Sequence, residues 1–284
     1  MSNTHLDRAK ILTEALPYIQ RYNGKIVVVN CGGVAMDAEL RDAVATDITM
    51  LRLVGIKVVL VHGIGPEVKQ ALAQSGRELV QKEGVYQIGL EAMEILQEVL
   101  CGKVNKDLVA LINRRGGRAV GLCGMDGGLF QAAQLDPKYG LVGEILKVDP
   151  QMVVDSLRGG YIPVVSTVAQ GVDGPAAYNI NADTAAAKLA VALGAEKLML
   201  LTDVRGLLRD PADEDTLIHQ VRVSEIPGLI KDGVIQGGMI PKIDCAVEAV
   251  RSGVHSTVIL DGRIAHSILI ELLSDAGVGT MLVQ

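Results

Sequence analysis

Runs of consecutive apolar residues recur along this chain, most of them followed by a turn that contains glycine. They lie at residues 25–29, 57–61, 161–165 and 197–201. Runs of this length are typical of strands that are buried on both faces of a parallel sheet. Helical patterns follow at roughly 38–53 and at 184–193. The repetition predicts an α/β fold, a three-layer sandwich whose open, mainly parallel sheet has helices on both faces.

Residues 7–22 carry a different pattern, with apolar positions spaced as on one face of a helix. Pro17 lies inside this pattern and is expected to kink or break the helix, because proline lacks an amide N–H and its ring crowds the preceding turn. Such a helix either packs against the rest of the chain or reaches another subunit. We predict that residues 1–24 form a kinked N-terminal oligomerisation helix.

Two lobes are predicted to share one continuous sheet without a flexible linker, because each half of the chain has its own set of glycine turns. The first lobe spans 25–176 and the second 177–284. Polar stretches at 170–177 and 209–216 indicate exposed loops. In parallel sheets ligands bind at the carboxyl ends of the strands, so the turns after residues 29, 61 and 201 are the informative ones.

Composition narrows the class of protein. Apolar residues make up 49% of the chain but aromatic residues only 2%, so Val, Ile, Leu, Ala and Met must fill the core. The net charge is −6 and the basic residues are dispersed, which argues against a nucleic-acid partner. The apolar runs are too short to cross a membrane. The four cysteines have neither C-x-x-C nor zinc-site spacing, which favours free thiols in a reducing compartment. The cytoplasm is expected, or the plastid stroma if a transit peptide has been removed.

Two glycine turns are candidate anion sites. Gly32 and Gly33 follow the first apolar run, where backbone N–H groups and a helix N-terminus would favour phosphate, although a tight turn also explains them. The chain has neither a P-loop motif nor a G-x-G-x-x-G sequence at this turn. The second turn, His62-Gly63-Ile64-Gly65-Pro66, offers donors for a second anionic group. His62 is either a core histidine bonded to the backbone or a catalytic base, and we favour the core histidine.

Two further segments combine polar side chains with a helix start. Asn179-Ile180-Asn181-Ala182-Asp183 precedes an alanine-rich helix, so Asp183 either caps that helix or orients lysines around a reacting phosphate. Gly237-Gly238-Met239-Ile240-Pro241-Lys242 opens another helix. Lys242 is either solvated or, because it directly follows a glycine pair, a phosphate contact.

Together these motifs resemble the acetylglutamate kinase family in order and spacing from about residue 10 to residue 282. The segments that carry the resemblance are 25–66, 102–106, 112–128, 142–144, 179–183, 200–206, 237–242 and 261–263. The resemblance implies the amino acid kinase fold. It implies transfer of the γ-phosphoryl group of ATP to the side-chain carboxylate of N-acetyl-L-glutamate, a step of arginine biosynthesis. The first lobe would hold the acid and form a dimer, and the second lobe would bind the nucleotide.

The resemblance also implies roles for individual residues. Lys242 would neutralise phosphate charge, Asp183 would organise the catalytic lysines, and Asn30 would occupy the third catalytic position. The acid would be bound by Gly63, Ile64, Gly65, Tyr86 and Asn179. The nucleotide would be bound by Gly32, Gly33, Thr202, Asp203, Gly206, Gly238 and Lys242. Mg²⁺ would be held through the nucleotide, with no metal site of the protein's own.

Three of these positions depart from the family pattern. Asn30 stands where the family usually has a lysine that contacts the moving phosphoryl group. Ile64 replaces the middle of three glycines, where a β-branched residue is expected to be strained at positive φ and to crowd the substrate. Tyr86 replaces an arginine that would pair with a substrate carboxylate. We therefore predict that acetylglutamate kinase activity is weakened or lost.

Two alternatives remain beside a slow acetylglutamate kinase. One is a kinase for a different small acid. The other is a non-catalytic, nucleotide-binding paralogue that serves as a structural or regulatory subunit. The helix at 7–22 resembles that of the arginine-sensitive branch of cyanobacteria and plants, which implies a homohexamer built as a trimer of dimers. An active paralogue or the PII signalling protein is then a further candidate partner.

Overall fold

The computed structural model describes residues 3–32, 38–172, 174, 177–210, 212–275 and 277–284, with side chains from residue 10 onward. Its main sheet contains the strands β1 (Ile26–Asn30), β2 (Lys57–His62), β5 (Ala119–Cys123), β8 (Ile162–Ser166), β11 (Lys197–Thr202), β12 (Gln220–Arg222), β13 (Ser256–Asp261) and β14 (Thr280–Val283). They lie in the order β12-β14-β13-β11-β1-β2-β8-β5. Neighbouring strands are parallel except β13 and β14. The predicted open, mainly parallel sheet is confirmed.

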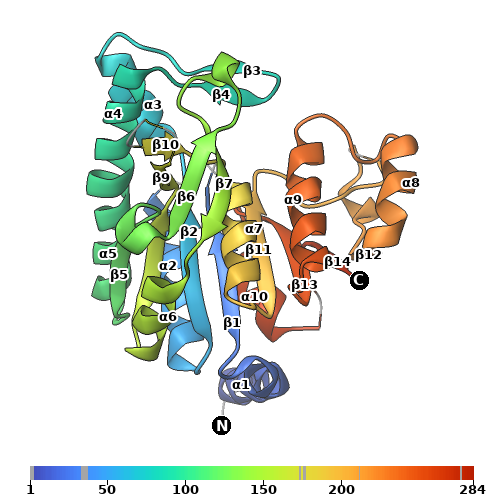
Figure 1. Ribbon diagram of the computed structural model, residues 1–284. Coiled ribbons are helices and arrows are strands. Elements are labelled where there is room, and N and C mark those ends of the chain that lie inside the picture. Colours follow the sequence, from blue (N-terminus) through green and yellow to red (C-terminus); the bar gives the residue numbers. More distant parts are fainter. Residues whose placement is uncertain (1–2, 33–37, 173, 175–176, 211, 276) are drawn as a thin grey trace.

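Helices cover both faces of this sheet (Figure 1). They are α1 (Asn3–Tyr22), α2 (Ala38–Leu53), α3 (Pro66–Gln74), α4 (Leu90–Gln97), α5 (Asn105–Arg114), α6 (Gln151–Arg158), α7 (Ala182–Ala192), α8 (Ile226–Lys231), α9 (Met239–Arg251) and α10 (Ser267–Leu273). Helices α2, α5 and α10 pack on one face, and α6, α7 and α9 pack on the other. The three-layer arrangement follows from the continuous apolar strands, since both of their faces must be covered.

Alternation along the central strands divides the core between the two faces. In β1, Val28 belongs to the apolar cluster beneath α7 and α9, whereas Val27 and Val29 belong to the cluster beneath α2 and α10. All three side chains are fully buried. Successive side chains of a strand point to opposite faces, so an uninterrupted apolar run supplies both clusters.

Smaller sheets complete the structure around one end of the main sheet. Strands β6 (Phe130–Gln134), β7 (Gly143–Val148), β9 (Val168–Gly171) and β10 (Ala177–Asn179) form a four-stranded sheet in the order β10-β9-β6-β7. Strands β3 (Val80–Lys82) and β4 (Val85–Gln87) form a hairpin. The stretch at 170–177 was predicted to be a loop, which is wrong at its ends, where β9 stops and β10 starts. A helix with seven π-helical residues, Glu98–Val104, joins α4 to α5.

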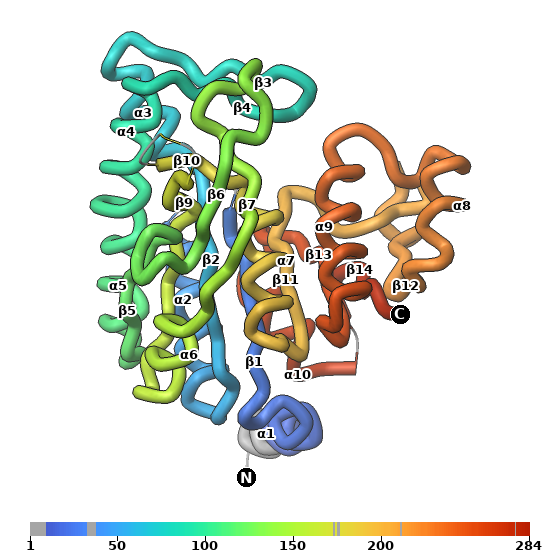
Figure 2. The backbone as a smooth tube through the Cα atoms, viewed as in Figure 1, coloured from blue at the N-terminus to red at the C-terminus, as the bar shows by residue number. Residues whose placement is uncertain are grey.

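Both predicted lobes contribute strands to the one main sheet. In Figure 2 the first part of the chain, with α3 to α6, lies to the left of β1 and α7, and the orange and red part, with α8 and α9, lies to the right. β1 pairs with β2 on one side and with β11 on the other, so the two parts meet along β1. The sheet continues across this boundary as expected.

Helix α1 runs without interruption through Pro17, so the predicted break does not occur. Its C-terminal part packs against the body of the protein: Tyr22 is buried, and the Tyr18 hydroxyl donates a hydrogen bond to Asp275. Ile11 and Leu12 are each 65% exposed. No helix in the described ranges has both the length and the apolar character that crossing a bilayer requires.

Candidate active site

A cavity of about 1030 Å³ opens at the carboxyl ends of β1, β2 and β11, between the N-termini of α7 and α9. Nine of the predicted site residues line it: Gly32, Ile64, Tyr86, Asn179, Asp183, Thr202, Asp203, Gly238 and Lys242. Asn30, Gly63, Gly65 and Gly206 lie outside this lining, and Gly33 lies outside the described residues. Side chains from across the sequence therefore meet where parallel strands end.

Asn181, rather than Asp183, caps the N-terminus of α7. Its Oδ1 accepts hydrogen bonds from the backbone N–H groups of Asp183 at 2.9 Å and Thr184 at 3.1 Å. A capping asparagine satisfies two of the amides that a helix start leaves unpaired. The capping role considered for Asp183 is therefore wrong, and its carboxylate is available to face the cavity.

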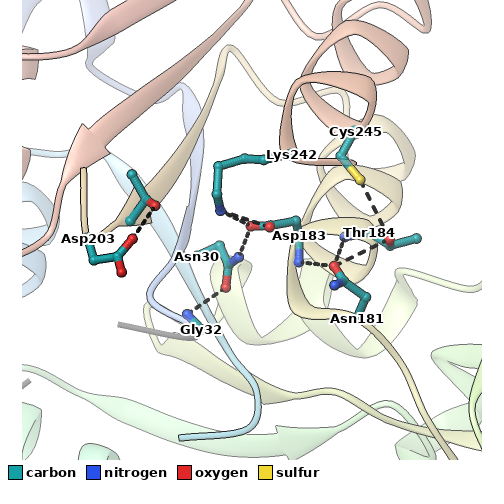
Figure 3. A network of polar contacts seen from close by, with 9 residues as sticks. Asn30, Gly32, Asn181, Asp183, Thr184, Asp203, Lys242 and Cys245 are labelled. Carbon is teal, nitrogen blue, oxygen red and sulfur yellow. Dashed lines mark hydrogen bonds and ion pairs between the residues drawn. The ribbon is translucent and has the colours of Figure 1, made fainter. Parts of the chain in front are cut away.

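Asp183 instead joins Lys242 and Asn30 in one polar cluster (Figure 3). Lys242 Nζ lies 2.9 and 2.8 Å from the two carboxylate oxygens of Asp183, and the two side chains are only 13% and 17% exposed. Asn30 Nδ2 donates to Asp183 Oδ1 at 2.8 Å. Asn30 Oδ1 accepts the N–H of Gly32 at 2.8 Å. Lys242 is thus not a solvated lysine, and the Asn30 amide uses one donor and one acceptor within the cluster.

The two glycine turns pack closely against the start of α7. A Cβ atom added to Gly32 would lie 2.4 Å from the Cβ of Ala182 and 3.2 Å from the backbone N of Gly63. A Cβ atom added to Gly63 would lie 2.8 Å from the same Ala182 atom. Only glycine fits at either position without a shift of α7. Backbone amides of both turns consequently lie beside a helix N-terminus, an arrangement that favours an anion.

Ile64 adopts an ordinary backbone conformation, so the strain expected at positive φ is absent. In the described chain Glu83 and His266 are the non-glycine residues with positive φ. Gly65, the N-cap of α3, has φ −129°, which any residue can adopt. Ile64 packs on the apolar cluster around Val68 and also lines the cavity. Its effect on the site is therefore its bulk alone.

His62 is a neutral core histidine, as favoured, but its partner is a side chain rather than the backbone. It is 2% exposed, and burial, with a smaller contribution from Lys106, lowers its pKa to about 3. Its Nε2 lies 3.1 Å from Nδ2 of the buried Asn105. An amide nitrogen can only donate, so Nε2 accepts. A group with this pKa is not a general base near neutral pH.

The end of the cavity at which a nucleotide was predicted to bind is formed by the loop after β11 and the start of α9. Thr202 Oγ1 donates to Asp203 Oδ1 at 3.3 Å, and both residues line the cavity. Gly238, the N-cap of α9, has no atom within 4 Å of an added Cβ position, so its surroundings are open. Gly206 has φ +144°, and an added Cβ would lie 2.6 Å from Thr280 Oγ1. Gly206 therefore shapes the loop without lining the cavity.

Asn179 and the β3–β4 hairpin form the opposite end. Asn179 ends β10, is 5% exposed, and its Oδ1 has no hydrogen-bond partner among the described residues. Tyr86 and Gln81 are cross-strand partners in the hairpin, and both line the cavity. A buried amide oxygen without a partner is costly, so Asn179 is suited to accept an N–H from a ligand.

Carboxylates outnumber cations around the cavity. Its described lining includes two lysines, Lys188 and Lys242, and the four acids Glu144, Asp183, Asp203 and Glu248. Both lysines are paired, since Lys188 Nζ lies 2.5 Å from Glu248. In the described ranges no group of three His, Cys, Asp or Glu residues is placed to hold a metal ion. Glycine amides and lysines at this cavity are suited to an anion such as a phosphate.

The sequence motifs assigned no site role to four residues that line the cavity: Asn181, Glu144, Lys188 and Gln81. For Asn181 a signal existed, because asparagine is among the best N-cap residues and a helix pattern follows it directly. Glu144 stands in a segment that was recognised only as part of the family resemblance. Lys188 and Gln81 give no local signal, because the fold alone brings the middle of α7 and the tip of a hairpin to the same cavity.

Comparison with known proteins identifies the family of this chain. The amino acid kinase family matches residues 25–261. The chain is 52% identical to an acetylglutamate kinase from Clostridium beijerinckii, over 98% of this chain and 99% of that protein. It is 49% identical to an acetylglutamate kinase from Thermosynechococcus vestitus, over 98% of this chain and 94% of that protein. The chain therefore belongs to the amino acid kinase family, and the predicted resemblance is confirmed.

Solved structures show the same fold. N-acetylglutamate synthase from Neisseria gonorrhoeae, complexed with coenzyme A and N-acetyl-glutamate, has a TM-score of 0.83 and 26% identity. That match covers 97% of this chain but 63% of the synthase, so the chain spans less than two thirds of that protein's length. Carbamate kinase from Giardia, with a TM-score of 0.65 and 20% identity, shares the fold.

Proposed function

We propose that this chain transfers the γ-phosphoryl group of MgATP to the carboxylate of a small acid. The observation that carries the proposal is the Asn30–Asp183–Lys242 cluster, whose Asp183 and Lys242 line a cavity of about 1030 Å³ beside the Gly32 turn. A cavity of this size is at the upper end of the usual range for ligand sites, which leaves room for two ligands. The similarity to acetylglutamate kinases makes N-acetyl-L-glutamate the reference acid.

The proposed reaction needs positioning and charge neutralisation rather than covalent catalysis by the protein. A carboxylate oxygen of the acid attacks the γ-phosphorus, and the bond to ADP breaks, which yields an acyl phosphate. The amides of Gly32 and Gly63 would donate to the phosphoryl oxygens, and Lys242 would neutralise charge on the phosphates. Asp183 would keep the Lys242 ammonium in place through the pair observed here. Mg²⁺, carried by the nucleotide, would supply the remaining positive charge.

Phosphorylation of N-acetyl-L-glutamate by this chain is proposed to be slow. Asn30 carries no charge, and its amide is already committed to Asp183 and Gly32. Ile64 adds bulk, and Tyr86 offers one neutral hydroxyl in place of the charged guanidinium of an arginine. Loss of a single electrostatic contact of this kind typically costs about 10²–10³ in kcat. The losses are not multiplied, because residues of one site act as a unit.

Formation of a hydroxamate tests the proposed reaction, because hydroxylamine traps acyl phosphates. The full chain is incubated with MgATP, an acid and hydroxylamine, and Lys242→Met serves as the comparison. The proposal predicts product that requires MgATP, the acid and Lys242. Calorimetry with MgADP accompanies the assay. Absence of nucleotide binding in the unmodified chain would refute the proposal.

A non-catalytic subunit is the second candidate, favoured by the exposed apolar residues Ile11, Leu12 and Leu16 on α1. Such a face suits contact between copies of this chain, which we propose to form a hexamer as a trimer of dimers. This assembly would then include an active paralogue or bind the PII signalling protein. Nucleotide binding without any hydroxamate from a panel of small acids would support this candidate.

A further inference from the structure

The two ends of the cavity differ in charge. Both lysines that line it, Lys188 and Lys242, belong to α7 and α9 at the nucleotide end. At the hairpin end Glu144 is the charged residue among the described lining residues. The segments outside the described ranges contain neither Lys nor Arg, so they add no cation. The acid end thus combines one carboxylate with neutral and apolar groups.

The polar groups at this end suit N–H donors on a ligand. Asn179 Oδ1 is buried and has no partner in the described chain, so it is an available acceptor. Val142 forms a bridge with Asn179, which puts Glu144, two residues further along, at the same end. Tyr86 and Gln81 contribute a hydroxyl and an amide, which donate or accept without charge.

Two cations close to the hairpin face a different space. Lys69 and Arg77 line a second cavity of about 510 Å³, which shares only Gln81 and Tyr86 with the first. Arg77 is already paired with Glu91. A ligand carboxylate at the hairpin end of the main cavity would therefore meet Glu144 without a compensating cation. Loss of a charge-assisted hydrogen bond lowers the affinity for a ligand by roughly 10- to 100-fold.

We infer that the acid bound at this site is a monocarboxylate whose far end carries neutral or cationic N–H groups. Its single carboxylate lies toward Lys242, where the phosphoryl group arrives, and its N–H groups face Asn179, Tyr86 and Glu144. The assignment of one end to a reacting carboxylate rests on the proposed phosphotransferase function. The preference against a second carboxylate rests on the charges around the cavity.

Two acids that differ by one group test this inference. N-acetyl-L-glutamate and 4-acetamidobutyrate are the same molecule except for the α-carboxylate. Calorimetry on the full chain, saturated with MgADP, measures both affinities. The inference predicts that 4-acetamidobutyrate binds at least about tenfold more tightly. Equal or tighter binding of N-acetyl-L-glutamate, or binding of neither acid, overturns it. This readout is independent of turnover, so the preference stands even if the hydroxamate assay fails.

Two variants that each add one positive charge to the hairpin test whether the missing cation at the hairpin end causes this preference. Tyr86→Arg puts a guanidinium at the hairpin end and should raise the affinity for N-acetyl-L-glutamate at least about tenfold. The same variant should not raise the affinity for 4-acetamidobutyrate, which has no second carboxylate for the guanidinium to pair with. Val80→Arg is the control, because Val80 lies on the same hairpin, is 56% exposed and lines neither cavity. No gain from Tyr86→Arg, or an equal gain from Val80→Arg, would refute the local charge argument.

Discussion

Asp183 is the residue on which the site's polar contacts converge. It accepts a hydrogen bond from Asn30 and forms a close pair with Lys242, and both partners come from other parts of the chain. Its carboxylate also faces the space in which nucleotide phosphates are proposed to lie. Asp183 therefore has two opposed effects: it positions Lys242, and it repels the phosphates that Lys242 is proposed to bind.

Asp183→Asn separates these effects. We expect affinity for MgADP to rise by roughly tenfold, because a negative charge beside the phosphates is removed. Turnover in the hydroxamate assay should fall by about 10²-fold, because Lys242 is no longer held. Calorimetry and the trapping assay measure the two quantities. Asp244→Asn is the control, since Asp244 is exposed on α9 and does not line the cavity. Loss of nucleotide binding in Asp183→Asn alone would contradict this account.

Residue types at the site could be predicted from sequence, but their contacts could not. Motifs at strand ends identified Asp183 and Lys242 because glycine turns and helix starts leave a local pattern. The commitment of Asn30 to Asp183 joins positions 153 residues apart and has no local signal. Likewise, Ile64 has an ordinary φ and packs on the cluster around Val68, so the strain expected from its residue type alone was wrong.

At the scale of elements, local pattern predicted the central strands and α2 well. The helix expected at roughly 38–53 is α2, Ala38–Leu53. Prediction was poorer for β9 and β10, which are short antiparallel partners joined by a stretch that contains Gly and Pro. The π-helical turn at Glu98–Val104 also leaves no period that distinguishes it from α-helix. These errors have a common cause, since neither feature follows from a local hydrophobic period.

The exposed apolar positions of α1 make a prediction about assembly. Replacing Ile11, Leu12 and Leu16 together by lysine should reduce the mass measured by light scattering to about a third, since the proposed hexamer would separate into dimers. Stability should change little, because all three side chains are at least 50% exposed. Lysines at Leu53, Val80 and Leu146, which are also exposed, provide a control of equal charge. Equal mass for both variants and the unmodified chain would show that α1 is not the contact.

One sheet joins the two halves of the molecule, and a single cavity contains both the end proposed to bind the acid and the end proposed to bind the nucleotide. The sheet, its layers and the position of the cavity could be predicted from sequence. Apolar runs indicate the strands, glycine turns follow them, and ligands bind at the carboxyl ends of parallel strands. The charge balance around the cavity did not follow, because Glu144, Lys188 and Glu248 reach it through tertiary packing alone. That balance is the reason to expect slow reaction with a doubly charged acid.

Steady-state turnover with MgATP and N-acetyl-L-glutamate shows whether the three altered positions limit catalysis. The unmodified chain is compared with the Asn30→Lys, Ile64→Gly, Tyr86→Arg triple variant. The account predicts that the unmodified chain turns over at least about 10²-fold below the usual kinase range of roughly 1–100 s⁻¹. Asn30→Lys alone should not restore the rate, and the triple variant should exceed every single variant. Turnover within that range for the unmodified chain, or a folded, MgADP-binding triple variant without any gain, would contradict it.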